Sequence, residues 1–106
     1  MEIKVIEMGE VEKISRVKAD AETEEVCRTV LNAFKKSQKV IFRAIGAGAI
    51  NQTMKGIASA AIELKKGPMG IGRVLVEPFW FNGKGGNDED ISGLEFKVVY
   101  IAREES

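Results

Sequence analysis

The strongest constraint on the fold lies in the middle of the chain, where a strand-like segment meets a helix-like one across two glycines. Residues 40–42 are apolar and typical of a buried strand, and the apolar spacing over 48–66 predicts a helix. Between them, residues 44–52 read AIGAGAINQ. Gly46 and Gly48 permit a tight turn and close packing of helix on sheet. The free N–H groups at the helix start also favour an anion such as phosphate, so a structural and a binding role both remain open.

The charge distribution singles out the same region. The chain has 106 residues and carries sixteen basic and sixteen acidic residues, so its net charge is zero. Residues 37–66 hold five basic residues and one acidic residue, a net charge of +4, whereas residues 1–36 have a net charge of −1 and residues 67–106 of −3. The glycine junction, defined here as Gly46 to Gly48, therefore lies in the only positive segment.

Several classes of protein are disfavoured by composition. The chain has no histidine and only one cysteine, Cys27, which argues against histidine-based catalysis, Cys/His zinc sites and intramolecular disulfides. Cys27 lies on the apolar side of a predicted helix and is interpreted as a small buried residue. We therefore predict no catalytic residue, no metal and no cofactor. Without a run of about 18 apolar residues or a secretory pattern, we expect a cytoplasmic protein that is not associated with a membrane.

Hydrophobic periodicity predicts six main elements in the order β-α-β-α-β-β. These are a strand at 11–19, a helix at 22–36, a strand at 40–45, a helix at 48–66, and strands at 71–81 and 93–103. Residues 1–10 are interpreted as an additional strand or arm. The order predicts a single domain over 1–106 with the fold class of an α/β two-layer sandwich, in which two helices pack on one face of a mixed four-stranded sheet. Pro78 predicts an edge or a bend in its strand.

The aromatic run Phe79-Trp80-Phe81 has several possible roles. Its rings are suitable for stacking against unpaired bases. Adjacent strand residues point to opposite faces, however, so one or two of the three are expected in the core. An exposed tryptophan is also typical of a dimer contact.

The segment 44–52, followed by a helix with Lys55 and an alanine-rich face, closely resembles the stage V sporulation protein S family, which belongs to the Alba superfamily of small nucleic-acid-binding proteins. The resemblance implies an Alba-like β-α-β-α-β-β domain that forms a homodimer or a higher oligomer and binds DNA or RNA. It also implies a non-enzymatic role in the regulation of sporulation or gene expression, with the terminal hairpin reaching along the nucleic acid.

The resemblance and the positive segment together give the predicted binding residues. The resemblance implies a basic residue near the first loop, a group around the glycine junction and one at the hairpin tip: Lys18; Arg43, Asn51, Gln52 and Lys55; and Lys84. The charge pattern groups Lys65 and Lys66 with Arg43 and Lys55 as a phosphate-binding patch. Asn51 and Gln52 have an alternative role as amides that cap a helix or link subunits.

Two other functions remain open. Asp88, Glu89 and Asp90 in the hairpin loop would repel phosphate, which favours a protein-interaction regulator that keeps the fold without nucleic-acid affinity. A nucleotide-binding enzyme that uses the glycine junction is less well supported, because no third glycine follows at the spacing of dinucleotide-binding motifs.

Overall fold

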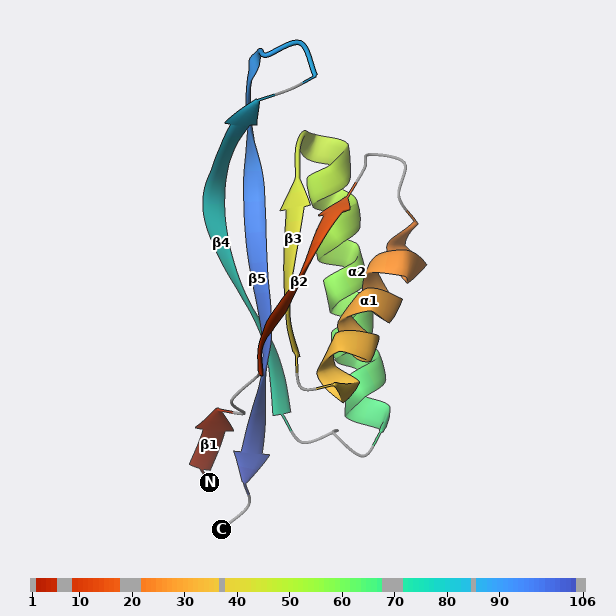
Figure 1. Ribbon diagram of the computed structural model, residues 1–106. Coiled ribbons are helices and arrows are strands. Elements are labelled where there is room, and N and C mark those ends of the chain that lie inside the picture. Colours follow the sequence, from red (N-terminus) through yellow and green to blue (C-terminus); the bar gives the residue numbers. More distant parts are fainter. Residues whose placement is uncertain are drawn as a thin grey trace.

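The computed structural model describes residues 2–5, 9–17, 22–36, 38–67, 72–84 and 86–104. Within these ranges the chain forms two helices and five strands (Figure 1). In chain order they are β1 (Glu2–Val5), β2 (Gly9–Val17), α1 (Thr23–Lys35), β3 (Gln38–Ala44), α2 (Ala47–Lys66), β4 (Gly72–Lys84) and β5 (Asp90–Glu104).

Strand β5 organises the sheet. It pairs antiparallel with β3, β4 and β1, while β2 pairs parallel with β3. Val98 lies opposite both Val40 of β3 and Val76 of β4, so these two strands occupy opposite edges of β5. Ile101 likewise lies between Val5 of β1 and β4, which places β1 on the same edge of β5 as β3.

The predicted four-stranded sheet is therefore wrong. The described residues form a five-stranded sheet in which β3, β5 and β4 make a three-stranded antiparallel unit, with β2 and β1 added to it. The physical reason is the length of β5. Its 15 residues span about 50 Å, whereas β3 has only seven residues, so the edge of β5 has room for a second partner beyond β3.

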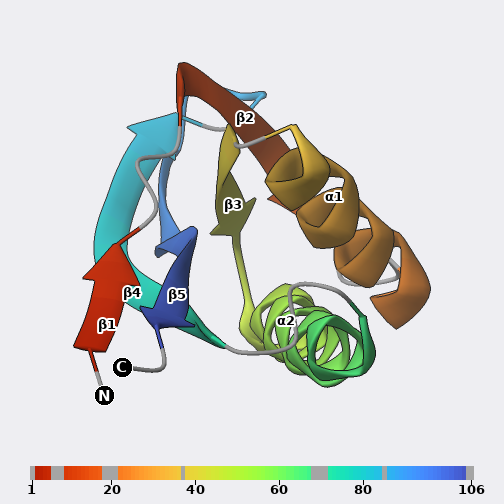
Figure 2. The same cartoon turned by 90° about the horizontal axis from the view of Figure 1, so that it is seen from below.

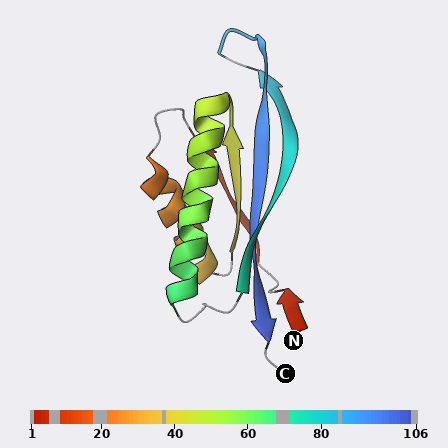
Figure 3. The ribbon, with the colours of Figure 1, turned by 180° about the vertical axis from the view of Figure 1, so that it is seen from behind.

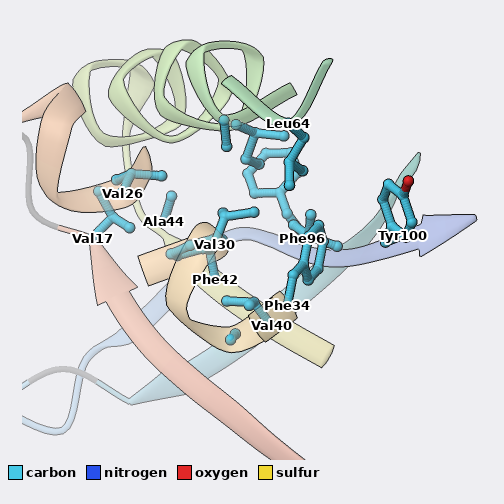
Figure 4. Close-up of a cluster of buried hydrophobic side chains, with 14 of the residues drawn as sticks. Val17, Val26, Val30, Phe34, Val40, Phe42, Ala44, Leu64, Phe96 and Tyr100 are labelled. Atoms are coloured by element: carbon cyan, nitrogen blue, oxygen red, sulfur yellow. The ribbon is translucent and has the colours of Figure 1, made fainter. Parts of the chain in front are cut away.

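Both helices lie on one side of the sheet, as the view from below shows (Figure 2). On β3, Val40, Phe42 and Ala44 alternate toward the helices and are buried. Figure 4 shows these side chains packed with residues of α1, α2 and β5. The remaining buried members of the cluster are Val17, Val26, Val30, Ala33, Phe34, Ala49, Ile57, Ala60, Leu64, Phe96, Val98 and Tyr100.

The two helices approach each other closely where α2 has a glycine. A Cβ atom added at Gly56 would lie 2.5 Å from Val26 Cγ1 of α1 and 2.9 Å from the Thr23 carbonyl oxygen. The fully buried hydroxyl of Thr53, on the same helix, donates a 2.7 Å hydrogen bond to the Ala49 carbonyl, so its burial leaves no unpaired donor. The missing side chain at Gly56 allows α2 to pack closely against α1, and the hydrogen bond of Thr53 within α2 allows its hydroxyl to be buried.

Cys27 is partly buried against the core from α1. Burial raises the pKa of its thiol, and the nearby Glu63 carboxylate raises this pKa further. A raised pKa disfavours the thiolate, which is the nucleophilic form. This environment agrees with the interpretation of Cys27 as a packing residue.

The hairpin of β4 and β5 extends beyond the ends of the helices (Figures 1 and 3). The face of the sheet turned away from both helices, called the helix-free face below, is formed by alternate residues of the three antiparallel strands. Those in the described part of the chain are Lys39, Ile41, Arg43, Arg73, Leu75, Glu77, Phe79, Phe81, Gly83, Ile91, Gly93, Glu95, Lys97, Val99 and Ile101.

Candidate nucleic-acid interface

The glycine junction connects β3 directly to α2. Gly46 is the N-cap residue with φ 88° and ψ 157°, a conformation that side-chain-bearing residues rarely adopt. Its carbonyl accepts the Ile50 N–H at 3.1 Å, and no side chain caps the helix. Gly48 lies in the first helical turn and is exposed, and among the described glycines only Gly46 has a positive φ. The turn therefore requires glycine at position 46 but not at position 48.

We expect alanine substitutions at these two positions to have opposite effects. Gly46→Ala should lower the free energy of unfolding by about 1–3 kcal/mol because of its backbone conformation. Gly48→Ala should raise it by about 0.5–1 kcal/mol because alanine is favoured inside a helix. Urea denaturation followed by circular dichroism measures both values. Equal changes in the two variants would contradict the assigned turn geometry.

Arg43 lies on the helix-free face. It follows Phe42, which is buried toward the helices, so its side chain points to the other side of the sheet. Arg43 Nε donates a 2.9 Å hydrogen bond to Glu95 Oε1 across β5. The guanidinium carbon also lies 4.8 Å from the centroid of the Phe81 ring, a cation–π contact. Arg43 is held by two neighbours and keeps 39% of its side-chain surface exposed.

Four of the predicted residues lie on the solvent side of α2: Asn51, Lys55, Lys65 and Lys66 are all exposed. Asn51 and Lys55 are one turn apart, and Lys65 lies about 15 Å further along the helix. Lys66 Nζ contacts Glu63 Oε1 at 3.4 Å. The first turn of α2 contains no acidic residue, so this end of the helix remains electrostatically positive.

The remaining predicted residues differ in their surroundings. Gln52 is half-buried. Lys84 is the last residue of β4 and forms a 2.5 Å ion pair with Asp90, the first residue of β5. Lys18 falls outside the described residues.

The structure does not bring all predicted cations together. Arg43 points away from the helices, whereas Lys55 and Lys65 are on the outer side of α2. The interpretation of these residues and Lys66 as one phosphate-binding patch is therefore wrong, because strand alternation turns Arg43 to the opposite side of the molecule. The predicted residues instead form separate groups on the helix-free face, on α2 and at the hairpin.

The aromatic run also differs from expectation. Phe79 and Trp80 are exposed and Phe81 is half-buried, and none of the three belongs to the described core. The expectation that one or two of them are core residues is wrong, because strand alternation turns Phe79 and Phe81 to the face of the sheet that the helices do not cover. The contacts of Arg43 with Phe81 and Glu95 were not predicted, since they depend on the pairing register of three strands.

These features define a small α/β protein with an exposed basic helix and an aromatic sheet face. The family model of stage V sporulation protein S matches residues 13–100, which is most of the chain. The protein therefore belongs to the stage V sporulation protein S family. This is a sporulation family and not a known class of enzyme. The search of curated proteins found no match.

Neither α1 nor α2, the helices of the described residues, is long and apolar enough to span a membrane.

Proposed function

We propose that this family member binds DNA or RNA and acts as a regulator of sporulation or gene expression. The observation that supports the proposal best is the solvent side of α2, where Asn51, Lys55, Lys65 and Lys66 are exposed. Along this helix Glu63, which contacts Lys66, is the only carboxylate. An extended row of lysines and an amide can contact successive phosphates of a nucleic-acid backbone.

The number of lysines sets the expected salt dependence. Each phosphate neutralised releases a condensed counterion, so the logarithm of the binding constant falls linearly with the logarithm of the salt concentration. Three α2 lysines correspond to a slope of roughly −3 for each protomer on duplex DNA. A binding reaction that lacks this dependence does not use the lysine row.

Charge reversal on α2 tests the proposal. We expect Lys55→Glu combined with Lys65→Glu to weaken binding to duplex DNA, single-stranded DNA and RNA by at least about tenfold, measured by fluorescence anisotropy at low salt. The matched control is Arg28→Glu combined with Lys35→Glu, which makes the same change of net charge on α1. No binding by the parent protein at low salt, or equal losses in both double variants, would contradict the proposal.

A homodimer is part of the proposal, because two copies double the number of phosphates contacted. Its support is the resemblance noted above together with the side chain of Trp80, which is 79% exposed. Tryptophan is enriched at subunit contacts. Sedimentation equilibrium measures the oligomeric state directly, and a protein that is monomeric at all accessible concentrations would refute the proposed homodimer.

A second candidate is a protein-interaction regulator. Arg43, Lys66 and Lys84 each already contact a carboxylate, which reduces their availability for phosphate. The exposed apolar side chains of Met54, Ile62 and Trp80 are also suitable for contact with a protein partner. This candidate is favoured if no nucleic acid binds at low salt.

A further inference from the structure

The helix-free face carries two aromatic rings side by side. Phe79 and Phe81 are alternate residues of β4, so their side chains point to the same face about 7 Å apart. Phe79 is 44% exposed although it is a large apolar residue. Opposite Phe81, β5 has Gly93, which places no side chain on this face. The Phe79 ring is therefore accessible from solvent, and the half-buried Phe81 ring lies beside it.

The planar guanidinium of Arg43 lies next to the two aromatic rings. Its guanidinium lies over the Phe81 ring, and Glu95 accepts the hydrogen bond from Nε. Among the described residues, the terminal nitrogens of this guanidinium have no hydrogen-bond partner and can donate to a ligand. Because the ring and the carboxylate already fix the side chain, little conformational entropy is lost when a ligand binds.

We propose that this face binds a single-stranded nucleic acid, with unpaired bases stacked on Phe79 and Phe81 and with Arg43 donating to a phosphate or a base edge. The inference rests on the proposed nucleic-acid function and specifies its substrate. Bases in a duplex hide their flat faces, so rings exposed on a sheet contact unpaired strands only. The lysines of α2 lie on the other side of the molecule and contact backbone phosphate without regard to pairing.

The charges of the face are compatible with an anionic ligand. Lys39, Arg43, Arg73 and Lys97 are its described cations, against Glu77 and Glu95. Glu77 lies opposite Lys97 in the register, and Glu95 is bonded to Arg43. Both carboxylates are thus placed beside a cation, and the net charge of the described face is positive.

Removal of the rings tests the inference. We expect Phe79→Ala and Phe81→Ala each to weaken binding of an unpaired oligothymidylate by about tenfold, while affinity for a duplex of the same length stays unchanged. Phe79→Trp should retain single-strand affinity, because tryptophan also stacks on bases. The matched control is Leu75→Ala, a residue of the same strand and face with a similar exposure of 41%. It should change neither affinity by more than about twofold.

Two further readouts keep the test decisive. Thermal melting shows whether each variant is folded, and in the parent protein the ring proton resonances of Phe79 and Phe81 should shift when oligothymidylate is added. Unchanged resonances, or equal single-strand affinity in Phe79→Ala and Leu75→Ala, would overturn the inference.

The outcomes also separate this inference from the proposed function. If charge reversal at Lys55 and Lys65 weakens nucleic-acid binding but the phenylalanine variants bind oligothymidylate normally, only the inference fails. If the parent protein binds neither duplex nor single strand at low salt, both fail. If, in that case, Phe79→Ala abolishes binding of a protein partner, the helix-free face is a protein-docking surface and not a base-stacking one.

Discussion

Gly56→Ala is expected to lower the free energy of unfolding by roughly 2–4 kcal/mol, even though alanine normally favours a helix by about 1 kcal/mol. The new Cβ would overlap Val26 of α1 and lie 2.9 Å from the Thr23 carbonyl oxygen. Neither neighbour can move independently, because a β-carbon and a backbone carbonyl are fixed to α1. The two helices must therefore separate, which opens the core beneath them. Urea denaturation measures the loss.

The control for this prediction is Gly48→Ala in the same helix. Gly48 is exposed, so we expect alanine there to gain helix propensity. A Gly56→Ala protein that is as stable as the parent would show that α1 and α2 are further apart than described. Both variants replace glycine by alanine in α2. The difference between their free energies of unfolding therefore measures the cost of the steric overlap between α1 and α2.

Gly93→Ala is expected to lower the free energy of unfolding by about 2–3 kcal/mol. Its Cβ would overlap the Ala44 carbonyl oxygen and lie 3.0 Å from Ile45 Cγ1. The overlap is with backbone at the end of β3, so either β3 moves away from β5 or β5 forms a bulge. Both changes disturb the neighbouring Arg43–Glu95 pair, and single-strand affinity should fall together with stability.

Gly83→Ala provides the matched control in the same hairpin. Its Cβ would lie 3.0 Å from the outer end of the Phe81 ring, and no backbone atom is among its nearest neighbours. A small change of χ1 moves the outer end of the ring away, so we expect little loss of stability. Backbone amide spectra of the Gly93→Ala protein should change in β3 as well as in β5. Changes confined to β5 would argue against the described contact.

Local patterns of the sequence predicted most elements of the fold. The helices at 22–36 and 48–66 agree with α1 and α2 within a residue, because apolar spacing and Gly67 mark their limits clearly. The interpretation of Pro78 as an edge residue is confirmed, since β5 is the only described strand that pairs with β4. The strand number was wrong, because the pairing of β1 depends on how far β5 extends and no local pattern encodes that length.

The candidate site was only partly predictable. The exposure of Lys55 follows from helix periodicity, as the sequence predicted. The face to which the Arg43 side chain points follows from strand alternation with Phe42. A count of charges along the chain does not take into account to which face each side chain points. Its contacts with Phe81 and Glu95 require the register of β3, β5 and β4, which is set by long-range pairing. That information is absent from any single segment.

The uneven pairing along β5 has a consequence for amide hydrogen exchange. Residues 94–98 have a neighbouring strand on both edges, whereas among the described strands residues 90–93 pair only with β4. The helices also cover one face of the two-sided part, so we expect its amides to exchange only when the whole molecule unfolds. The hairpin end can open alone. We therefore expect slow amide exchange over residues 94–98 and faster exchange over residues 90–93, and Phe79 and Phe81 lie opposite residues on either side of this boundary.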